Sequence, residues 1–132
     1  MALTFTAEEL AYLRSQHLGR LATVDAAGVP QNNPVGFFVD ETTGQVTIGG
    51  MEMGRSRKFR NVRSNPTAAL VVDDLASTDP WVVRFVEIRG SAEALMDVEP
   101  PMRGMSREVI RITPRWIASL GVDANETGKG RT

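Results

Sequence analysis

The sequence contains no cysteine, which excludes disulfide bonds, thiolate metal sites and cysteine nucleophiles. It has one histidine, so His-rich metal sites are excluded and Ser-His-Asp chemistry would have to use His17. No apolar run approaches membrane-spanning length, and the first residues lack the basic start and apolar core of a signal peptide. These absences predict a cytoplasmic protein without a metal site or membrane association. Any difficult chemistry would come from a bound cofactor.

The chain also has little net charge, because 15 Lys and Arg residues face 16 Asp and Glu residues. This balance gives no general attraction to nucleic acid or to an anionic membrane. The aromatic content is only 6%, which further disfavours a nucleic-acid surface that stacks bases. At 132 residues, the chain is expected to form one domain over residues 1–122, with a flexible polar tail at 123–132.

Alternating apolar residues predict about six strands, at 19–25, 30–40, 45–50, 67–74, 81–97 and 107–122, where each of the last two stretches is one strand or two. Gly28 marks a turn, residues 75–80 a loop, and Gly90 a bend or bulge. Pro30 and Pro34 cannot donate to a β-ladder, so their strand is expected at an edge. Short strands at this spacing are typical of an antiparallel sandwich or barrel.

Two short helices complete the predicted elements. Thr6 and Glu9 have the spacing of a capping box, with Gly19 as a candidate end of that helix and His17 interpreted as a helix-end residue. The second helix is expected to begin after Ser56, a good N-cap residue.

Positive charge is concentrated at this second helix, in Arg55, Arg57, Lys58, Arg60 and Arg63. Cations in a first turn oppose the helix dipole, so Arg57 and Lys58 make most sense beside a bound anion such as phosphate. Arg60 and Arg63 lie on another face and are interpreted as solvated. Charge alone favours a surface helix with basic decoration, and the first-turn placement makes the anion site an equally good explanation.

Several stretches together resemble the split β-barrel flavin and deazaflavin oxidoreductases, the superfamily of pyridoxamine 5'-phosphate oxidase. They are "LGRLATVDAAGVPQNNPVGFFVD", "VTIGG", "RSRKFRNVRSNPTAALVVDD" and "VRFVEIRGSAEAL". The closing "IRITPRWIASLGV" is similar to the actinobacterial branch that uses the deazaflavin coenzyme F420. The resemblance implies a mainly β fold with short helices, a six-stranded antiparallel split β-barrel of the FMN-binding type. It also implies a homodimer with the cofactor in a groove between the subunits.

The resemblance carries cofactor contacts over by position. Ser56, Arg57 and Lys58 match the phosphate-binding Ser-Arg-Lys, with Arg55 and Asn61 as additions. The strand segment of Asn32, Asn33, Pro34 and Val35 matches the backbone that runs along the flavin ring. Ile48, Gly49 and Gly50 match the adjoining strand end, where a missing side chain leaves room for the ring or the ribityl chain. Trp81 and Arg84 match a region that reaches the cofactor from the second subunit.

The implied function is a coenzyme F420-dependent reductase that transfers hydride to an activated C=C or C=N bond of a small organic substrate. Two alternatives stay open: an FMN-dependent oxidoreductase of the same fold, and a non-catalytic flavin- or tetrapyrrole-binding protein. Asn33 stands where the pyridoxamine phosphate oxidases have an Arg that contacts their flavin. This difference argues against pyridoxamine phosphate as the substrate. No side chain in the sequence stands out as the proton donor.

Overall fold

A computed structural model describes residues 3–123 and 129–132 of the chain. Its first helix, α1 (Ala7–Ser15), begins with the predicted capping box. The Thr6 hydroxyl accepts the Glu9 backbone N–H at 3.1 Å, and the Glu9 carboxylate accepts the Thr6 N–H at 2.9 Å. The helix ends at an extended Gln16, so the prediction that Gly19 terminates it was wrong. Gly19 instead opens the first strand, where a Cβ would meet a Leu70 methyl group at 2.8 Å.

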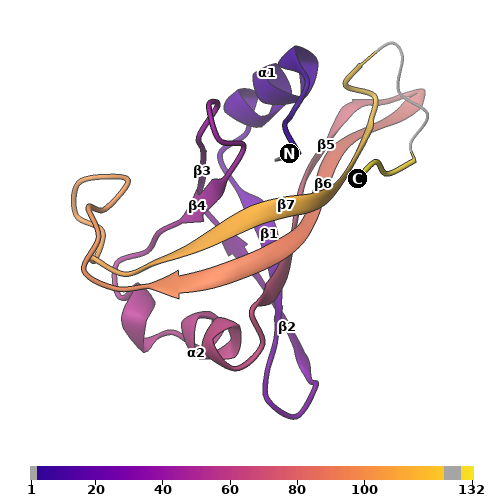
Figure 1. The fold of residues 1–132 in the computed structure, drawn as a ribbon. Coiled ribbons are helices and arrows are strands. Elements are labelled where there is room, and N and C mark those ends of the chain that lie inside the picture. The colour runs from indigo at the N-terminus through magenta and orange to yellow at the C-terminus, as the bar shows by residue number, and fades with distance from the viewer. Residues whose placement is uncertain (1–2, 124–128) are drawn as a thin grey trace.

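Seven antiparallel strands form one sheet in the part of the chain that the structure describes. Their order in the sheet is β2-β1-β5-β6-β7-β4-β3. The long strands β5 to β7 curve across the molecule, with α1 above them and α2 below (Figure 1). The strands are β1 (Gly19–Val24), β2 (Pro30–Val35), β3 (Phe37–Val39), β4 (Val46–Ile48), β5 (Thr67–Thr78), β6 (Trp81–Leu95) and β7 (Val109–Leu120).

Two predictions about the strands were wrong. The stretch 30–40 is not one strand, because the chain breaks at Gly36 between β2, which pairs with β1, and β3, which pairs with β4. The sheet therefore has seven strands instead of six. The predicted loop at 75–80 is mostly strand, since β5 runs to Thr78 and passes an irregularity between Leu75 and Ser77.

Other local predictions are confirmed. Pro30 and Pro34 lie in β2, which is an edge strand. Gly28 has a φ of 84° in the turn after β1, a conformation that favours glycine. Gly90 sits at a register shift between β6 and β7, where a Cβ would overlap the Thr113 carbonyl oxygen.

The inward faces of the strands fill the interior with aliphatic side chains, so the barrel has a packed core instead of a channel. A small ligand must therefore bind outside this core. The most deeply buried core residues include Val46, Ile48, Leu70, Val72, Val86, Ile88, Ile110, Ile112 and Ile117, all at 0% exposure. Among the described residues, no helix is long and apolar enough to cross a membrane.

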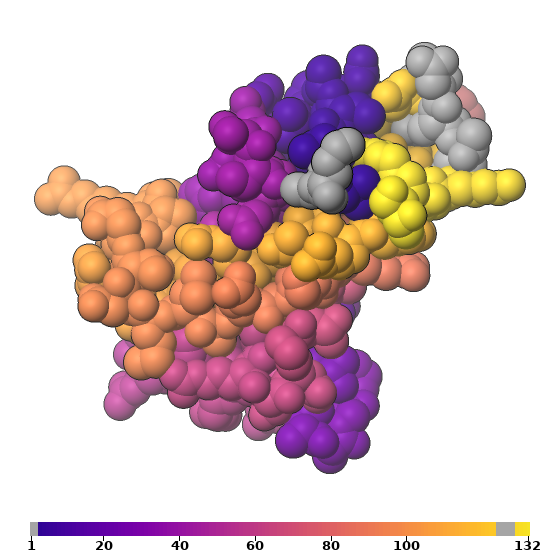
Figure 2. Space-filling view, viewed as in Figure 1, coloured from indigo at the N-terminus to yellow at the C-terminus, as the bar shows by residue number. Residues whose placement is uncertain are grey.

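The end of the chain returns to the barrel beside α1. Arg131 forms a β-bridge with Ile117, and its guanidinium donates to the Glu9 carboxylate at 2.9 and 2.6 Å and to the Thr4 carbonyl at 3.0 Å. The predicted tail spans 123–132, of which residues 124–128 lie outside the described residues. In the space-filling view, the yellow C-terminal residues lie against the indigo N-terminal segment (Figure 2).

Candidate functional site

The basic helix α2 (Arg57–Ser64) begins as predicted at Ser56. The Ser56 hydroxyl accepts the Phe59 backbone N–H at 3.3 Å and donates to the Met53 carbonyl at 2.6 Å. Met53 belongs to a short 3-10 turn, η1 (Met53–Arg55), which leads directly into α2. The Ser56 side chain thus bonds both the turn and the helix. The orientation of the helix start is therefore determined by residues close to it in the sequence.

The cations at the start of α2 are unpaired. Arg57 is exposed and Lys58 is half-buried, and within residues 3–123 and 129–132 neither side chain has a hydrogen-bonding or ion-pair partner. The first turn contains no acidic residue. Two free cations therefore stand at the positive end of the helix dipole, beside N–H groups that lack intrahelical acceptors. This arrangement fits an anion such as a phosphate group.

The other cations of the cluster are engaged differently. Arg55 lies 3.6 Å from the Glu52 carboxylate, but both side chains are more than 70% exposed, so the pair is weak. Arg60 donates to the Arg55 carbonyl at 3.4 Å, and Arg63 stacks over Phe59 with 5.1 Å to the ring centre. The structure thus separates Arg57 and Lys58, which are free, from cations that already have contacts.

Asn61 is 4% exposed and faces the barrel from α2. Its amide nitrogen donates to the Thr23 hydroxyl at 3.0 Å and to the Gln31 side-chain oxygen at 3.1 Å. These bonds join α2 to β1 and β2, so Asn61 positions the helix. Direct contact between Asn61 and a cofactor stays a prediction. Gln31, which no sequence pattern marks, completes this partly buried polar contact.

The turn before η1 gives its two glycines different surroundings. A Cβ on Gly49 would meet Met105 Sδ at 2.6 Å and Pro101 Cγ at 2.9 Å, so side chains of the β6–β7 loop occupy that space. A Cβ on Gly50 would meet nothing closer than 3.9 Å. The room that the resemblance implies for a cofactor is therefore present at Gly50 and filled by the protein itself at Gly49.

Two residues that sequence reasoning missed hold this turn in place. Ser106 Oγ accepts the Met53 N–H at 3.0 Å and donates to the Gly50 carbonyl at 3.2 Å. The Glu108 carboxylate accepts the Gly54 N–H at 3.2 Å. Both lie more than 50 residues along the chain from the groups they bind, and no local pattern marks them. Figure 2 shows the orange β6–β7 loop against the magenta segment that leads into α2.

The predicted ring-contact segment lies on β2. Asn32, Asn33 and Pro34 line an open hollow of about 300 Å³ together with Arg20, whereas Val35 is buried in the core. Arg20 is paired with Asp73 of β5. An edge strand with a hollow beside it suits the docking of a planar polar group, and Val35 can contribute only through its backbone.

The ends of β2 and β4 are close because of the sheet register. After Val35 the chain passes through Gly36 alone, and Phe37 then pairs with Ile48. The fold therefore brings the end of the ring-contact segment near Ile48 and Gly50, and so near the turn into α2.

Within one chain, Trp81 and Arg84 do not lie near the turn into α2. They lie toward the tip of the β5–β6 hairpin, which is remote from α2 (Figure 1). Arg84 donates to the Asp74 carboxylate at 2.9 and 2.5 Å and lies over the Tyr12 ring, and the Tyr12 hydroxyl also donates to Asp74 at 2.9 Å. Arg84 is thus engaged within its own chain, whereas Trp81 is 67% exposed.

This cluster also affects titration. Burial, followed by the hydrogen bond to Asp74, raises the pKa of Tyr12 well above its usual range. The hydrogen bond from Arg84 is the largest influence on Asp74 and holds the pKa of that carboxyl below its ordinary value. Tyr12 therefore keeps its proton at neutral pH, and the cluster fastens α1 to the β5–β6 hairpin.

Comparison with protein families gives one match over nearly the whole chain. Residues 5–130 match the family described as pyridoxamine 5'-phosphate oxidase. A curated relative, the 5a,11a-dehydrotetracycline/5a,11a-dehydrooxytetracycline reductase of Streptomyces rimosus, is 49% identical over 129 residues. The match covers 93% of this chain and 87% of that protein.

Solved structures show the same fold at low sequence identity. An F420 reductase has a TM-score of 0.65 and 24% identity, with 86% of this chain and 98% of that chain covered. A heme binding protein from Mycobacterium smegmatis has a TM-score of 0.69 and 18% identity. That match covers 98% of this chain but only 59% of the other, so this chain spans about three-fifths of its length. The predicted resemblance to split-barrel flavin and deazaflavin proteins is confirmed.

Proposed function

Because the chain belongs to the pyridoxamine 5'-phosphate oxidase family of oxidoreductases, we propose that it is a deazaflavin-dependent reductase. Its reaction would add hydride and a proton across an activated C=C or C=N bond of a small organic substrate. The 49% identity to the Streptomyces rimosus reductase favours a C=C bond in a polycyclic molecule.

The observation that carries the proposal is the pair of free cations at the start of α2. Arg57 and Lys58 would hold the phosphate of the cofactor together with the first N–H groups of the helix. Gly50 would leave room for the adjoining chain, and the β2 segment from Asn32 would face the ring. The weakly held Arg55 would serve the acidic extension that distinguishes a deazaflavin from FMN.

The bound cofactor would supply the hydride, and the protein would supply binding, orientation and exclusion of water. Tyr12 is unsuited to donate the proton, because its raised pKa makes it a weak acid and its hydroxyl is bonded to Asp74. His17 is exposed beyond the end of α1. The proton would come from water or from a group on the substrate.

The proposal includes a homodimer. Several large apolar side chains near the tip of the β5–β6 hairpin are exposed, which suits contact with a second subunit. In that assembly Trp81 would reach the partner's cofactor, whereas Arg84 would act indirectly through Asp74. The exposed apolar residues are Leu75, Trp81, Val82, Val83 and Leu120.

The test is a titration of the purified protein with the deazaflavin and, separately, with FMN, followed by cofactor fluorescence. Tight binding of the deazaflavin is expected. Binding of FMN alone would favour the FMN-dependent alternative, binding without turnover would favour a carrier, and no binding of either would reject the proposal.

Site variants make the test specific to the helix start. Arg57→Gln and Lys58→Gln should each weaken cofactor binding, because a charged hydrogen bond contributes about 1.5–3 kcal/mol, or about 10- to 100-fold in affinity. Arg115→Gln is the matched control, since this exposed arginine belongs to β7 and not to the helix start. Cofactor affinity equal to wild type in all three variants would show that the basic turn is only a solvated surface.

A further inference from the structure

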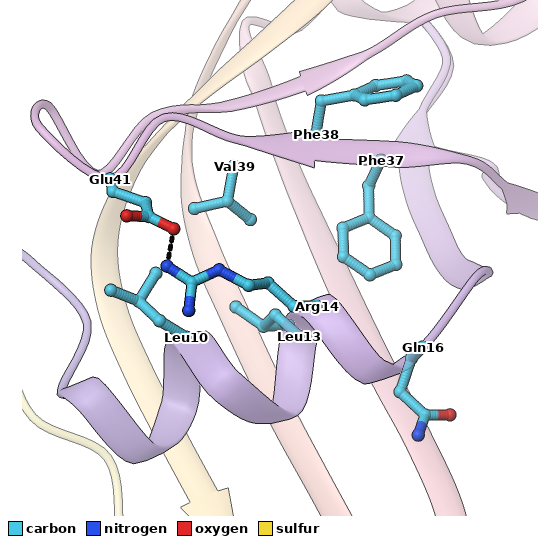
Figure 3. Close-up of a pocket in the computed structure, with 8 residues that line it drawn as sticks. All are labelled: Leu10, Leu13, Arg14, Gln16, Phe37, Phe38, Val39 and Glu41. Carbon is cyan, nitrogen blue, oxygen red and sulfur yellow. Dashed lines mark ion pairs between the residues drawn. The ribbon is translucent and has the colours of Figure 1, made fainter.

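A cavity of about 270 Å³ lies between α1 and the edge strand β3. Figure 3 shows Leu10 and Leu13 rising from the helix and Phe37 and Val39 descending from the strand. Leu13 is 2% exposed, so the floor of the cavity reaches the hydrophobic core. The cavity opens to solvent on one side, and a concave surface with apolar walls and a few polar groups is a natural ligand site.

Polar groups gather at the rim of this cavity. Arg14 of α1 pairs with Glu41, which follows β3, and Gln16 stands at the end of the helix (Figure 3). The Arg14 and Glu41 side chains are 59% and 51% exposed, so water screens their attraction and the pair is easily exchanged for another partner. The cavity therefore suits a molecule with an apolar body and an acidic edge.

One wall of the cavity is continuous in sequence with the proposed cofactor site. Phe37, which lines it, is separated by Gly36 alone from the β2 segment that would face the cofactor ring. A molecule held against Phe37 could extend toward that segment.

The volume also limits what the cavity can hold. Sites for drug-sized molecules span about 300–1,000 Å³, so this cavity would enclose only one end of a four-ring substrate. The name of the Streptomyces rimosus enzyme gives the reacting bond as 5a,11a, and the letter a denotes ring-fusion atoms. Such a bond lies inside the fused system and would remain outside the cavity when a terminal ring enters it.

We propose that the α1–β3 cavity is the substrate subsite of this reductase. It takes the terminal ring of a planar, polycyclic enol or phenol, with Leu10, Leu13 and Phe37 against the ring and Arg14 beside an acidic oxygen. The proposal rests on the reductase activity proposed above, but it concerns a different part of the molecule from the start of α2.

The ion pair at the rim provides the sharpest test. Tetracycline, the ring system of the reduced product, is titrated by calorimetry into the full-length protein without cofactor. Arg14→Gln should weaken binding about fivefold, because it removes the exposed cation that faces the ligand. Glu41→Gln should tighten binding about twofold, because it frees Arg14 and removes a competing anion. A purely structural ion pair would shift both variants in the same direction, and Arg115→Gln should leave binding unchanged.

A second variant tests the cavity itself. Leu10→Trp places a bulky indole at the partly buried rim of the cavity and should reduce tetracycline affinity at least tenfold. The same protein should still bind the deazaflavin. Thermal unfolding of the variant verifies that it is folded, and retained cofactor binding verifies this independently. Tetracycline affinity equal to wild type in Leu10→Trp, or equal shifts in Arg14→Gln and Glu41→Gln, would overturn the proposal.

The two proposals fail in different ways. Wild-type protein that binds the deazaflavin but shows no tetracycline binding would overturn the substrate subsite and leave the cofactor site intact. Wild-type protein that binds neither cofactor would overturn the proposed function.

Discussion

Removal of the Arg131 guanidinium should destabilise the protein, because it leaves the Glu9 carboxylate buried without its counter-charge. Glu9 is 1% exposed and lies at the first turn of α1. Arg131 gives it two hydrogen bonds, of 2.9 and 2.6 Å, from the other end of the chain. Arg131→Gln keeps a polar side chain but removes the charge.

The magnitude follows from the burial of the two partners. Removing one member of a fully buried ion pair costs about 3–5 kcal/mol. Here the Arg131 side chain is 39% exposed, so water reaches that side and the cost should fall to about 2 kcal/mol. At about 2.1 cal/mol/K of unfolding entropy per residue, this cost lowers the Tm by about 7 °C.

A double-mutant cycle separates the charge from the packing. Glu9→Gln should be mild, since Gln also serves in a capping box and the freed Arg131 can be hydrated. Arg131→Gln introduced into the Glu9→Gln protein should then cost less than about 0.5 kcal/mol, because no buried charge is left behind. Denaturant unfolding at pH 7 measures all three variants.

The effect should also depend on pH. Burial by itself raises the pKa of Glu9, but the hydrogen bonds from Arg131, Thr6 and Ser119 outweigh it and hold the pKa below its ordinary value. A depressed carboxyl pKa adds stability above the unfolded pKa of about 4.3, and this stability is lost as the pH falls through the folded pKa. The difference between wild type and Arg131→Gln should therefore be complete at pH 7 and shrink below about pH 4. A cost that is the same at pH 7 and pH 3, or that persists in the Glu9→Gln background, would refute this reasoning.

Two further predictions concern glycines that lie against other groups. A Cβ on Gly130 would overlap the indole of Trp116, so Gly130→Ala should displace the chain end and shift Trp116 emission to longer wavelength. The spectrum is read in a Trp81→Phe background, and an unchanged spectrum would show that the chain end does not cover the ring. Gly90→Ala should cost about 1–3 kcal/mol of unfolding free energy, because its Cβ would overlap a backbone carbonyl of the neighbouring strand. Gly36→Ala, where a Cβ meets nothing within 4 Å, should stay within about 0.5 kcal/mol of wild type, and equal losses in the two variants would contradict the steric explanation.

The sequence was sufficient for features that depend on near neighbours in the chain. The capping box of Thr6 and Glu9 and the cap formed by Ser56 each need groups only three residues apart. The edge position of Pro30 follows from its missing N–H, and the turn at Gly28 from the freedom of glycine to adopt a positive φ. The basic first turn of α2 belongs to the same class, because a dipole argument requires only the helix start and the residues beside it.

The tertiary structure was needed wherever distant segments meet. It divides the stretch 30–40 at Gly36 because the two halves pair with opposite edges of the sheet. It fills the space at Gly49 with Met105, engages Arg84 with Asp74, and leaves Arg57 without a partner among the described residues. Whether a glycine leaves room or a cation is free depends on which remote side chain arrives there, and that depends on packing across the whole barrel instead of on any local pattern.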